Sequence, residues 1–142
     1  MAIKNLTDQL IRDEGVVLHE YKDHLGYSTI GIGRLIDKRK GGGISLDEAR
    51  FLLNNDIARV SNEVRKALPW SEKLSYARFG VLLNMAFQMG IQGLLGFKNT
   101  LAMIERGDYQ AAAKGMLNSK WATQTPARCK RLSVQMETGE WQ

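Results

Sequence analysis

Residues 14–33 of this chain, EGVVLHEYKDHLGYSTIGIG, decide its fold class. The apolar residues before them recur at helical spacing (Ile3, Leu6, Leu10 and Ile11), and Gly15 supplies a stop signal. The stretch itself then becomes rich in tyrosine, threonine and isoleucine, which favour strands, punctuated by Gly26, Gly31 and Gly33. The pattern predicts a short helix whose last turn holds Glu14, followed by two or three short antiparallel strands with a turn at residues 23–26.

The rest of the sequence predicts helices. Ser45 and Glu48 form a capping-box pattern, and the apolar spacing after them predicts a helix of about twenty residues that ends before Pro69. Residues 76–89 are apolar on all sides, as in a buried central helix, and Gly90 can cap it. Further helices are predicted near 98–106, 108–119 and 126–137, with Asp108 as an N-cap and Pro126 at a first helical position.

These elements predict an α+β fold in a single domain, residues 1–142. A small N-terminal lobe with a β-hairpin sheet, residues 15–45 or so, is joined by the long helix to a larger, all-helical C-terminal lobe. We expect that helical lobe to comprise residues from about 67 to 142 together with the N-terminal helix. A cleft is expected between the two lobes.

The charge, cysteine count and apolar content of the chain limit the classes of function that it can have. The chain has 20 Lys and Arg against 15 Asp and Glu, so its net charge of +5 favours anionic partners. Lysines and arginines are scattered without interleaved aromatic residues, which gives a nucleic-acid surface little support. One cysteine, Cys129, excludes an internal disulfide and is typical of a reducing compartment. We expect no signal peptide and no stable membrane insertion, because no segment approaches the roughly 20 apolar residues of a membrane span.

Glu14 and Asp23 are the candidate catalytic pair. Two carboxyl groups on different backbone elements can face each other across a cleft, and glycosidases use such a pair on either side of the scissile bond. Each residue also has an ordinary explanation, since Glu14 can be a helix-end charge and Asp23 a turn-forming residue. His19 and His24 have no metal-ligand spacing, so neither a metal nor another cofactor is expected.

The spacing of Glu14, Asp23 and Thr29, followed by Ile-Gly-Ile-Gly, resembles the phage T4-type lysozymes, a family of muramidase endolysins in glycoside hydrolase family 24. The resemblance covers nearly the whole chain and continues through residues 84–90 (NMAFQMG), 96–100 (GFKNT), 119–121 (SKW), 124–128 (QTPAR) and 138–141 (TGEW). It implies that Glu14 is the general acid, which must carry a proton near neutral pH. Asp23 would be an ionised carboxylate that helps to activate water, and Thr29 would help to position that water.

Four further residues are candidate substrate-binding positions: Gly33, Phe87, Gln88 and Arg128. Glycine lets the backbone approach a ligand closely. The resemblance implies that Gln88 can bind a sugar amide and that Arg128 approaches the catalytic glutamate and ties the lobes together. Trp121 and Trp141 match structural positions of the family and are expected in the core.

Two departures from the family pattern stand out. Arg34 follows Gly33 where the best-known members have a histidine with a largely structural role, which puts an ion pair of the folded state in doubt. The segment from Arg34 to Ser45 is also shorter than in those members, so part of the cleft rim is expected to differ.

The resemblance implies hydrolysis of the β-1,4 bond between N-acetylmuramic acid and N-acetylglucosamine in peptidoglycan, leading to host-cell lysis. A monomeric enzyme would accumulate in the host cytoplasm until a holin opens the inner membrane, and would then reach the periplasm and cell wall. Two alternatives stay open. One is another glycan-cleaving enzyme, a lytic transglycosylase or a chitinase; the other is a non-catalytic module that binds the wall or nucleic acid.

Overall fold

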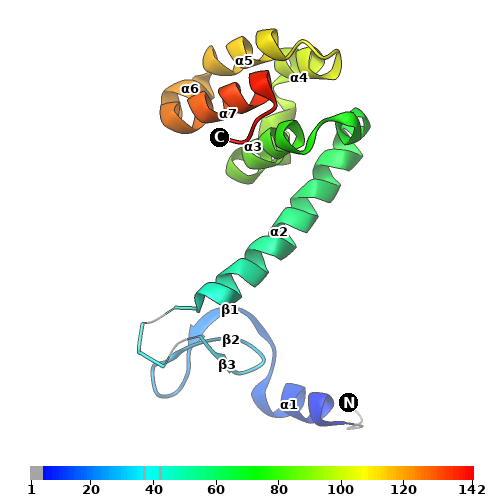
Figure 1. The fold of residues 1–142 in the computed structure, drawn as a ribbon. Helices are drawn as coiled ribbons and strands as arrows, with labels where there is room; N and C mark the ends of the chain where they lie inside the picture. Colours follow the sequence, from blue (N-terminus) through cyan, green and yellow to red (C-terminus); the bar gives the residue numbers. More distant parts are fainter. Residues whose placement is uncertain (1–4, 37, 42) are drawn as a thin grey trace. The chain divides into compact units, whose positions relative to one another are not determined.

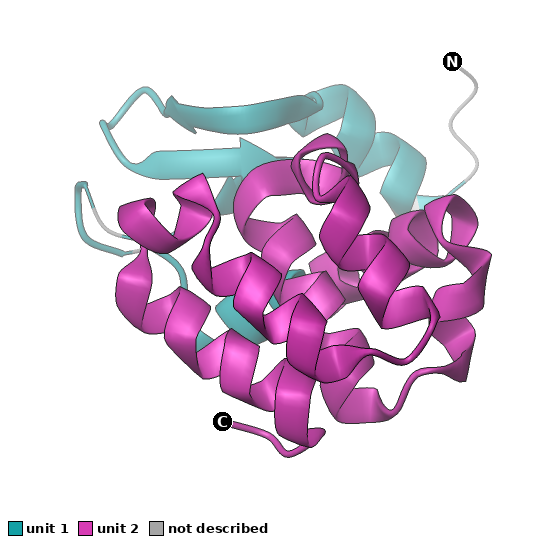
Figure 2. Ribbon diagram, turned by 90° about the horizontal axis from the view of Figure 1, so that it is seen from above, with its two compact units in different colours: residues 1–53 teal, residues 54–142 magenta. Residues whose placement is uncertain are grey.

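The computed structural model describes residues 5–36, 38–41 and 43–142 and confirms the α+β fold (Figure 1). Ile3, predicted to begin the apolar face of the first helix, lies outside the described residues. The chain forms two compact units, unit 1 (residues 1–53) and unit 2 (residues 54–142), which Figure 2 shows in different colours. The lobe boundaries given above, including the place of the N-terminal helix, stay predictions.

Unit 1 begins with helix α1 (Leu6–Glu14), and Asn5 caps it by accepting a hydrogen bond from the Asp8 backbone N–H at 2.9 Å. The predicted stop is confirmed, since Gly15 has a φ of 75° and its N–H donates to the Ile11 carbonyl. Three strands follow and form one antiparallel sheet in sequence order: β1 (Val17–Lys22), β2 (Ser28–Gly31) and β3 (Arg34–Leu35).

Helix α2 (Leu46–Ala67) confirms the predicted long helix and continues from unit 1 into unit 2. Its first turn is capped by Ser45, whose Oγ accepts from the Glu48 N–H at 3.1 Å. The other half of the predicted capping box is wrong, because the Glu48 carboxylate pairs with Arg34 of β3 instead of the helix start. A fully charged partner gives the stronger hydrogen bond to a carboxylate, so the side chain turns toward the sheet.

Unit 2 contains a 3-10 helix, η1 (Pro69–Lys73), and five helices: α3 (Tyr76–Leu95), α4 (Lys98–Glu105), α5 (Tyr109–Leu117), α6 (Lys120–Gln124) and α7 (Pro126–Thr138). The predicted caps are confirmed at Asp108, which accepts from the Ala111 N–H, and at Pro126 in the first turn of α7. Gly90 interrupts α3 with a φ of 78°, which ends its first segment where the sequence predicted. The short elements η1 and α6 were not predicted, because single turns leave no periodic pattern.

The hydrophobic core described for the chain lies in unit 2, where α5 packs against α7 and α4, and α3 against α7. Its fully buried side chains include Val64, Leu82, Met116 and Met136. Trp121 is buried as predicted and meets the Phe97 ring edge-on. Trp141, also expected in the core, is 66% exposed, because it lies near the chain end after α7 has finished.

Within the described residues no single helix is long and apolar enough to cross a bilayer. The bent pair α3 and α4, at 103° to each other, meets the length and composition only when both helices are counted together.

Candidate active site

Glu14 ends α1 at the point where the chain turns into the sheet of unit 1. Its side chain lies against Gly33, the second residue of the two-residue loop that joins β2 to β3. A Cβ atom placed on Gly33 would fall 2.7 Å from Cδ of the Glu14 carboxyl group and 3.0 Å from its Cγ. Gly33 also has a φ of +64°, a conformation that strains other residues. Two independent reasons, space and backbone angle, therefore require glycine beside the candidate acid.

Asp23 opens the turn between β1 and β2. Its Oδ1 accepts hydrogen bonds from the backbone N–H groups of Leu25 and Tyr27, both at 2.9 Å. The backbone N–H groups of Tyr27 and Leu25 hold the pKa of Asp23 below its ordinary value of 3.8, although desolvation acts in the opposite direction. Asp23 is thus both a turn-forming residue and a carboxylate that stays ionised, so the two explanations of this residue are compatible.

Thr29 lies on β2 and is 4% exposed. Its Oγ1 donates a hydrogen bond to the carbonyl oxygen of Tyr27 at 3.1 Å, which leaves the lone pairs of Oγ1 to accept one from another group. The same Tyr27 carbonyl accepts from the backbone N–H of Asp23 at 2.9 Å. The backbone of Tyr27 therefore links Asp23 and Thr29 directly, and the structure brings these two predicted site residues together.

Tyr27 is a functional position that the sequence analysis missed. Its contribution comes from the peptide N–H and C=O rather than from the ring, so its residue type carried no signal for this role. The sequence Asp-His-Leu-Gly, followed by Tyr-Ser-Thr, is typical of a turn that returns into a strand, and that is the one clue the sequence offers.

Arg34 follows the Gly33 loop and forms an ion pair with Glu48 of α2. The position that departs from the family's histidine therefore carries a charge-assisted link between β3 and the first turn of α2. Both residues belong to unit 1, so the link fixes the loop that carries Gly33 against that helix. The sequence left it in doubt whether this position forms an ion pair in the folded state. The structure has one, and its cation is an arginine, which stays positively charged.

In unit 2, Gln88 is held by two neighbours. Its Nε2 donates to Thr125 Oγ1 at 3.1 Å, and its Oε1 accepts from the Trp121 indole N–H at 2.9 Å. These contacts use one amide hydrogen and one lone pair, so the other amide hydrogen and the second lone pair of Oε1 can still bind a sugar. Phe87 precedes it on α3 and is 39% exposed, which suits a ligand contact better than a core position.

Arg128 is a half-buried residue near the start of α7, and its guanidinium is held by Asn84 of α3. Nη2 donates to Asn84 Oδ1 at 2.6 Å and Nε donates to the same oxygen at 2.8 Å, so two hydrogen bonds that converge on one acceptor fix the orientation of the guanidinium plane. Asn84 was quoted above only as part of a family motif. The structure gives it the definite role of orienting Arg128. Since Glu14 belongs to the other unit, the expected approach of Arg128 to it stays a prediction.

The candidate site thus has two parts. Unit 1 holds an acid beside a glycine loop, an ionised carboxylate and a buried hydroxyl, which together supply groups for acid–base hydrolysis of a glycoside. Unit 2 holds oriented donors on Gln88 and Arg128 and an exposed aromatic ring on Phe87. Among the residues of the structure that can be described, no three His, Cys, Asp or Glu side chains gather as metal ligands would.

Comparison with known proteins agrees with this chemistry. The model of the family described as phage lysozyme matches residues 12–134. Similar proteins include probable T4-type lysozyme 1 of Dictyostelium discoideum, 36% identical over 96% of both chains, and the pre-baseplate central spike protein of Enterobacteria phage T4, 32% identical over 95% of this chain and 28% of that protein. A peptidoglycan hydrolase of Pseudomonas phage phiKMV is 29% identical over 94% of this chain and 16% of its own length.

Proposed function

Because this chain belongs to the phage lysozyme family and is a peptidoglycan hydrolase, we propose that it is an N-acetylmuramidase. It cleaves the β-1,4 bond between N-acetylmuramic acid and N-acetylglucosamine without a cofactor. The observation that carries the proposal is the turn of unit 1, where one backbone, that of Tyr27, holds both an ionised Asp23 and the Thr29 hydroxyl.

The residues divide the reaction between them. Protonated Glu14 gives its proton to the glycosidic oxygen as the bond to the leaving sugar breaks. Asp23, kept ionised by the turn amides, stabilises the positive charge that develops on the other sugar and accepts a proton from the attacking water. Thr29 accepts a hydrogen bond from that water and so orients it. Glu14 then takes up a proton from solvent and Asp23 releases its proton to solvent, which returns both groups to their starting forms.

The glycine loop supports Glu14 in this role. Because Gly33 has no side chain, the Glu14 carboxyl group lies directly against the loop backbone. A sugar bound over this loop would lie beside that carboxyl group, so the proton could pass directly to the glycosidic oxygen.

The remaining elements of the proposal concern the biological setting. Gln88, Phe87 and Arg128 bind the glycan, with Arg128 oriented by Asn84. The enzyme acts as a monomer that lyses a bacterial host from within, leaving the cytoplasm through a holin lesion to reach the periplasm and wall. This setting rests on the family rather than on a feature of the site.

The test is hydrolysis of purified murein sacculi by the wild type and by Glu14→Gln. We expect the variant to lose turbidity clearing by a factor of about 10² to 10⁴ while still sedimenting with sacculi. Asp13→Asn is the matched control, since it removes a neighbouring exposed carboxylate of the same helix and should leave the rate unchanged.

Two outcomes would contradict the proposal. Clearing by Glu14→Gln at nearly the wild-type rate would remove the assigned acid. Mass spectrometry of the products separates hydrolysis from the rival reaction: reducing muramic acid ends support a muramidase, whereas 1,6-anhydro ends would identify a lytic transglycosylase.

A further inference from the structure

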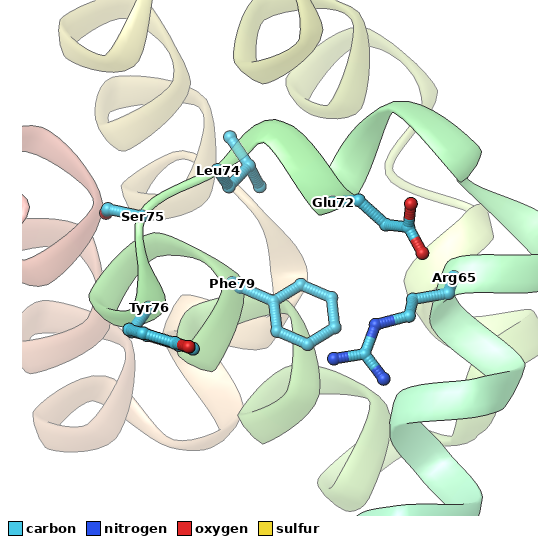
Figure 3. Close-up of a pocket in the computed structure, with 6 residues that line it drawn as sticks. All are labelled: Arg65, Glu72, Leu74, Ser75, Tyr76 and Phe79. Atoms are coloured by element: carbon cyan, nitrogen blue, oxygen red, sulfur yellow. The ribbon is translucent and has the colours of Figure 1, made fainter.

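A depression in the surface of unit 2 has no part in the site described above. It consists of two pockets where the end of α2, η1 and the start of α3 meet. The first, of about 530 Å³, is lined by Arg65, Glu72, Leu74, Ser75, Tyr76 and Phe79 (Figure 3). The second, of about 460 Å³, is lined by Ser61, Arg65, Tyr76, Phe79, Gly80, Leu83 and Trp141. Three residues line both pockets, so we treat them as one continuous surface and call it the Arg65 depression.

Arg65 is fixed in place at the centre of this depression. The Cζ atom of its guanidinium lies 4.9 Å from the centroid of the Phe79 ring, a cation–π contact visible in Figure 3. Phe79 is 9% exposed and belongs to the core, which makes it a rigid support. No ion pair or hydrogen bond joins the guanidinium to another of the described residues, so its planar set of donors is available to a ligand.

Two exposed aromatic rings line the same depression as the arginine. Tyr76 is 88% exposed and Trp141 is 66% exposed. Trp141 lies against α3 at Gly80, because a Cβ atom on Gly80 would fall 2.8 Å from Cζ3 of the indole ring. Because Gly80 has no side chain, the indole ring can pack directly on the helix while most of its surface stays exposed to solvent. Large aromatic side chains exposed in a hollow are a mark of binding surfaces.

The chemistry of the lining matches a saccharide. Sugar rings present apolar C–H faces that pack on aromatic rings, and hydroxyl and amide groups at their edges that need both donors and acceptors. Tyr76 and Trp141 offer the first kind of contact. Arg65 supplies donors and Glu72, on the rim of the same pocket, supplies carboxylate acceptors. The lining contains both polar and apolar side chains, unlike the hydrophobic pockets that bind purely apolar ligands.

We propose that the Arg65 depression is a second glycan-binding site, which holds a strand of the polymeric substrate through residues other than those that cut it. The identity of the glycan as an N-acetylated murein strand rests on the proposed function. Such a site raises the time that the enzyme spends on an insoluble wall, because a second contact makes rebinding of the catalytic residues intramolecular. It adds nothing for a substrate too short to reach both sites.

The first test is direct binding, which needs no catalysis. Amide chemical shifts of the Glu14→Gln protein are followed by NMR while a β-1,4-linked tetramer of N-acetylglucosamine, and then peptide-free murein glycan strands, are added. We expect shifts at residues 65, 72–80 and 141, and we expect Tyr76→Ala to weaken binding there by about three- to tenfold. Absence of shifts at these residues with both glycans would overturn the proposal.

The second test separates this site from the catalytic one. Tyr76→Ala and Arg65→Gln should raise the KM for intact sacculi by about three- to tenfold and leave the rate on short soluble muropeptides unchanged. Lys73→Ala, an exposed charge of η1 that does not line the depression, is the control and should behave as wild type. Equal losses on sacculi and on short fragments would overturn the proposal. If the wild type cleaves neither substrate but the glycan shifts appear, the muramidase assignment fails and the second site stands.

Discussion

The two units of this protein differ in what holds them together and in what they carry. Unit 1 contains the candidate acid, carboxylate and hydroxyl, but its buried residues among those described are only Ser28 and Thr29, both polar. Unit 2 holds the hydrophobic core. The charge divides in the same way: unit 1 has eight Lys and Arg against eight Asp and Glu, whereas unit 2 has twelve against seven. The entire excess of positive charge therefore lies on the unit that carries three of the four predicted substrate-binding residues, Phe87, Gln88 and Arg128.

This difference shows which candidate groups each unit supplies and what holds them in place. The carboxyl groups of unit 1 lie where few apolar contacts stabilise the backbone, and hydrogen bonds through Tyr27 and the Arg34–Glu48 ion pair take the place of packing. Functional segments are commonly drawn from the less stable parts of a protein. Unit 2 presents its donors from helices fixed by a core, and it carries the net positive charge of the chain.

The largest expected effect comes from removing the charge of Asp23 without disturbing its turn. In Asp23→Asn the amide oxygen can still accept from the N–H groups of Leu25 and Tyr27, so the turn is preserved. We expect a loss of about 10² to 10⁴ in the rate of murein hydrolysis, with a small fall in melting temperature because the ionised carboxylate that the turn amides stabilise is gone. Asp23→Ala, which also breaks the turn, should lose activity and stability together.

The pH dependence follows from the same residue. Hydrogen bonds from the turn amides hold the pKa of Asp23 in the folded protein below 3.8, its ordinary value. A depressed carboxylate pKa stabilises the fold above the unfolded pKa, and this contribution disappears as the pH falls through the folded pKa. The difference in stability between wild type and Asp23→Asn should therefore be constant from pH 7 to 5 and shrink below pH 4. A difference that already shrinks between pH 7 and 5 would contradict the assignment.

The next effect tests the core of unit 2. Leu82 of α3 is fully buried, so Leu82→Ala should lower the free energy of unfolding by about 2 to 5 kcal/mol. Leu18→Ala in unit 1, where the side chain is 86% exposed, should cost less than about 0.5 kcal/mol. Urea denaturation of both variants measures the contrast, and equal costs would break the comparison between the units.

Gly33→Ala is expected to have a smaller effect, and mainly on activity. A methyl group there would strain a backbone with φ of +64° and would push the Glu14 carboxyl group away. We expect a stability cost of about 1 to 3 kcal/mol and a loss in kcat of about tenfold. Gly31→Ala is the matched control, because Gly31 also has a positive φ, of 71°, but has open space where its Cβ would go. Similar losses in kcat for both variants would mean that the contact with Glu14 is immaterial.

The smallest effect concerns the ion pair of Arg34 and Glu48. Both side chains contact water, with 63% and 32% of their surfaces exposed, so a double-mutant cycle with Arg34→Gln and Glu48→Gln should give a coupling of about 1 kcal/mol or less. The coupling should fall in high salt. A coupling that is zero at low salt would remove the ion pair from the forces that hold unit 1.

Much of this fold could be predicted from sequence, and the failures have local physical causes. The stop at Gly15, the three strands and the helix after Ser45 follow from glycine, capping and periodicity signals that act within a few residues. The direction of the Glu48 side chain could not be predicted, because its choice between Ser45 and Arg34 depends on where the sheet places Arg34. The prediction that Trp141 lies in the core was wrong, because this side chain has no periodic apolar neighbours that show which face is buried.

The candidate site likewise combines residues that the sequence could predict with contacts that it could not. Glu14, Asp23 and Thr29 carry chemistry in their side chains, so their residue types and spacing could signal a glycosidase. The contact between Glu14 and Gly33 and the hydrogen bonds between Arg128 and Asn84 depend on residues 19 and 44 positions apart, and no local pattern encodes them. The Arg65 depression draws on three elements and the chain end, which equally requires the folded structure.

The peptide groups of Tyr27 have a consequence for anyone who redesigns this protein. Since both its N–H and its C=O are engaged, position 27 should accept many side chains yet reject proline, which lacks the N–H donor. A library that varies this position freely would explore the neighbourhood of the carboxylate at little risk. The contacts to Asp23 and Thr29 come from the main chain of Tyr27, so we expect the residue type at position 27 to vary without changing the proposed reaction.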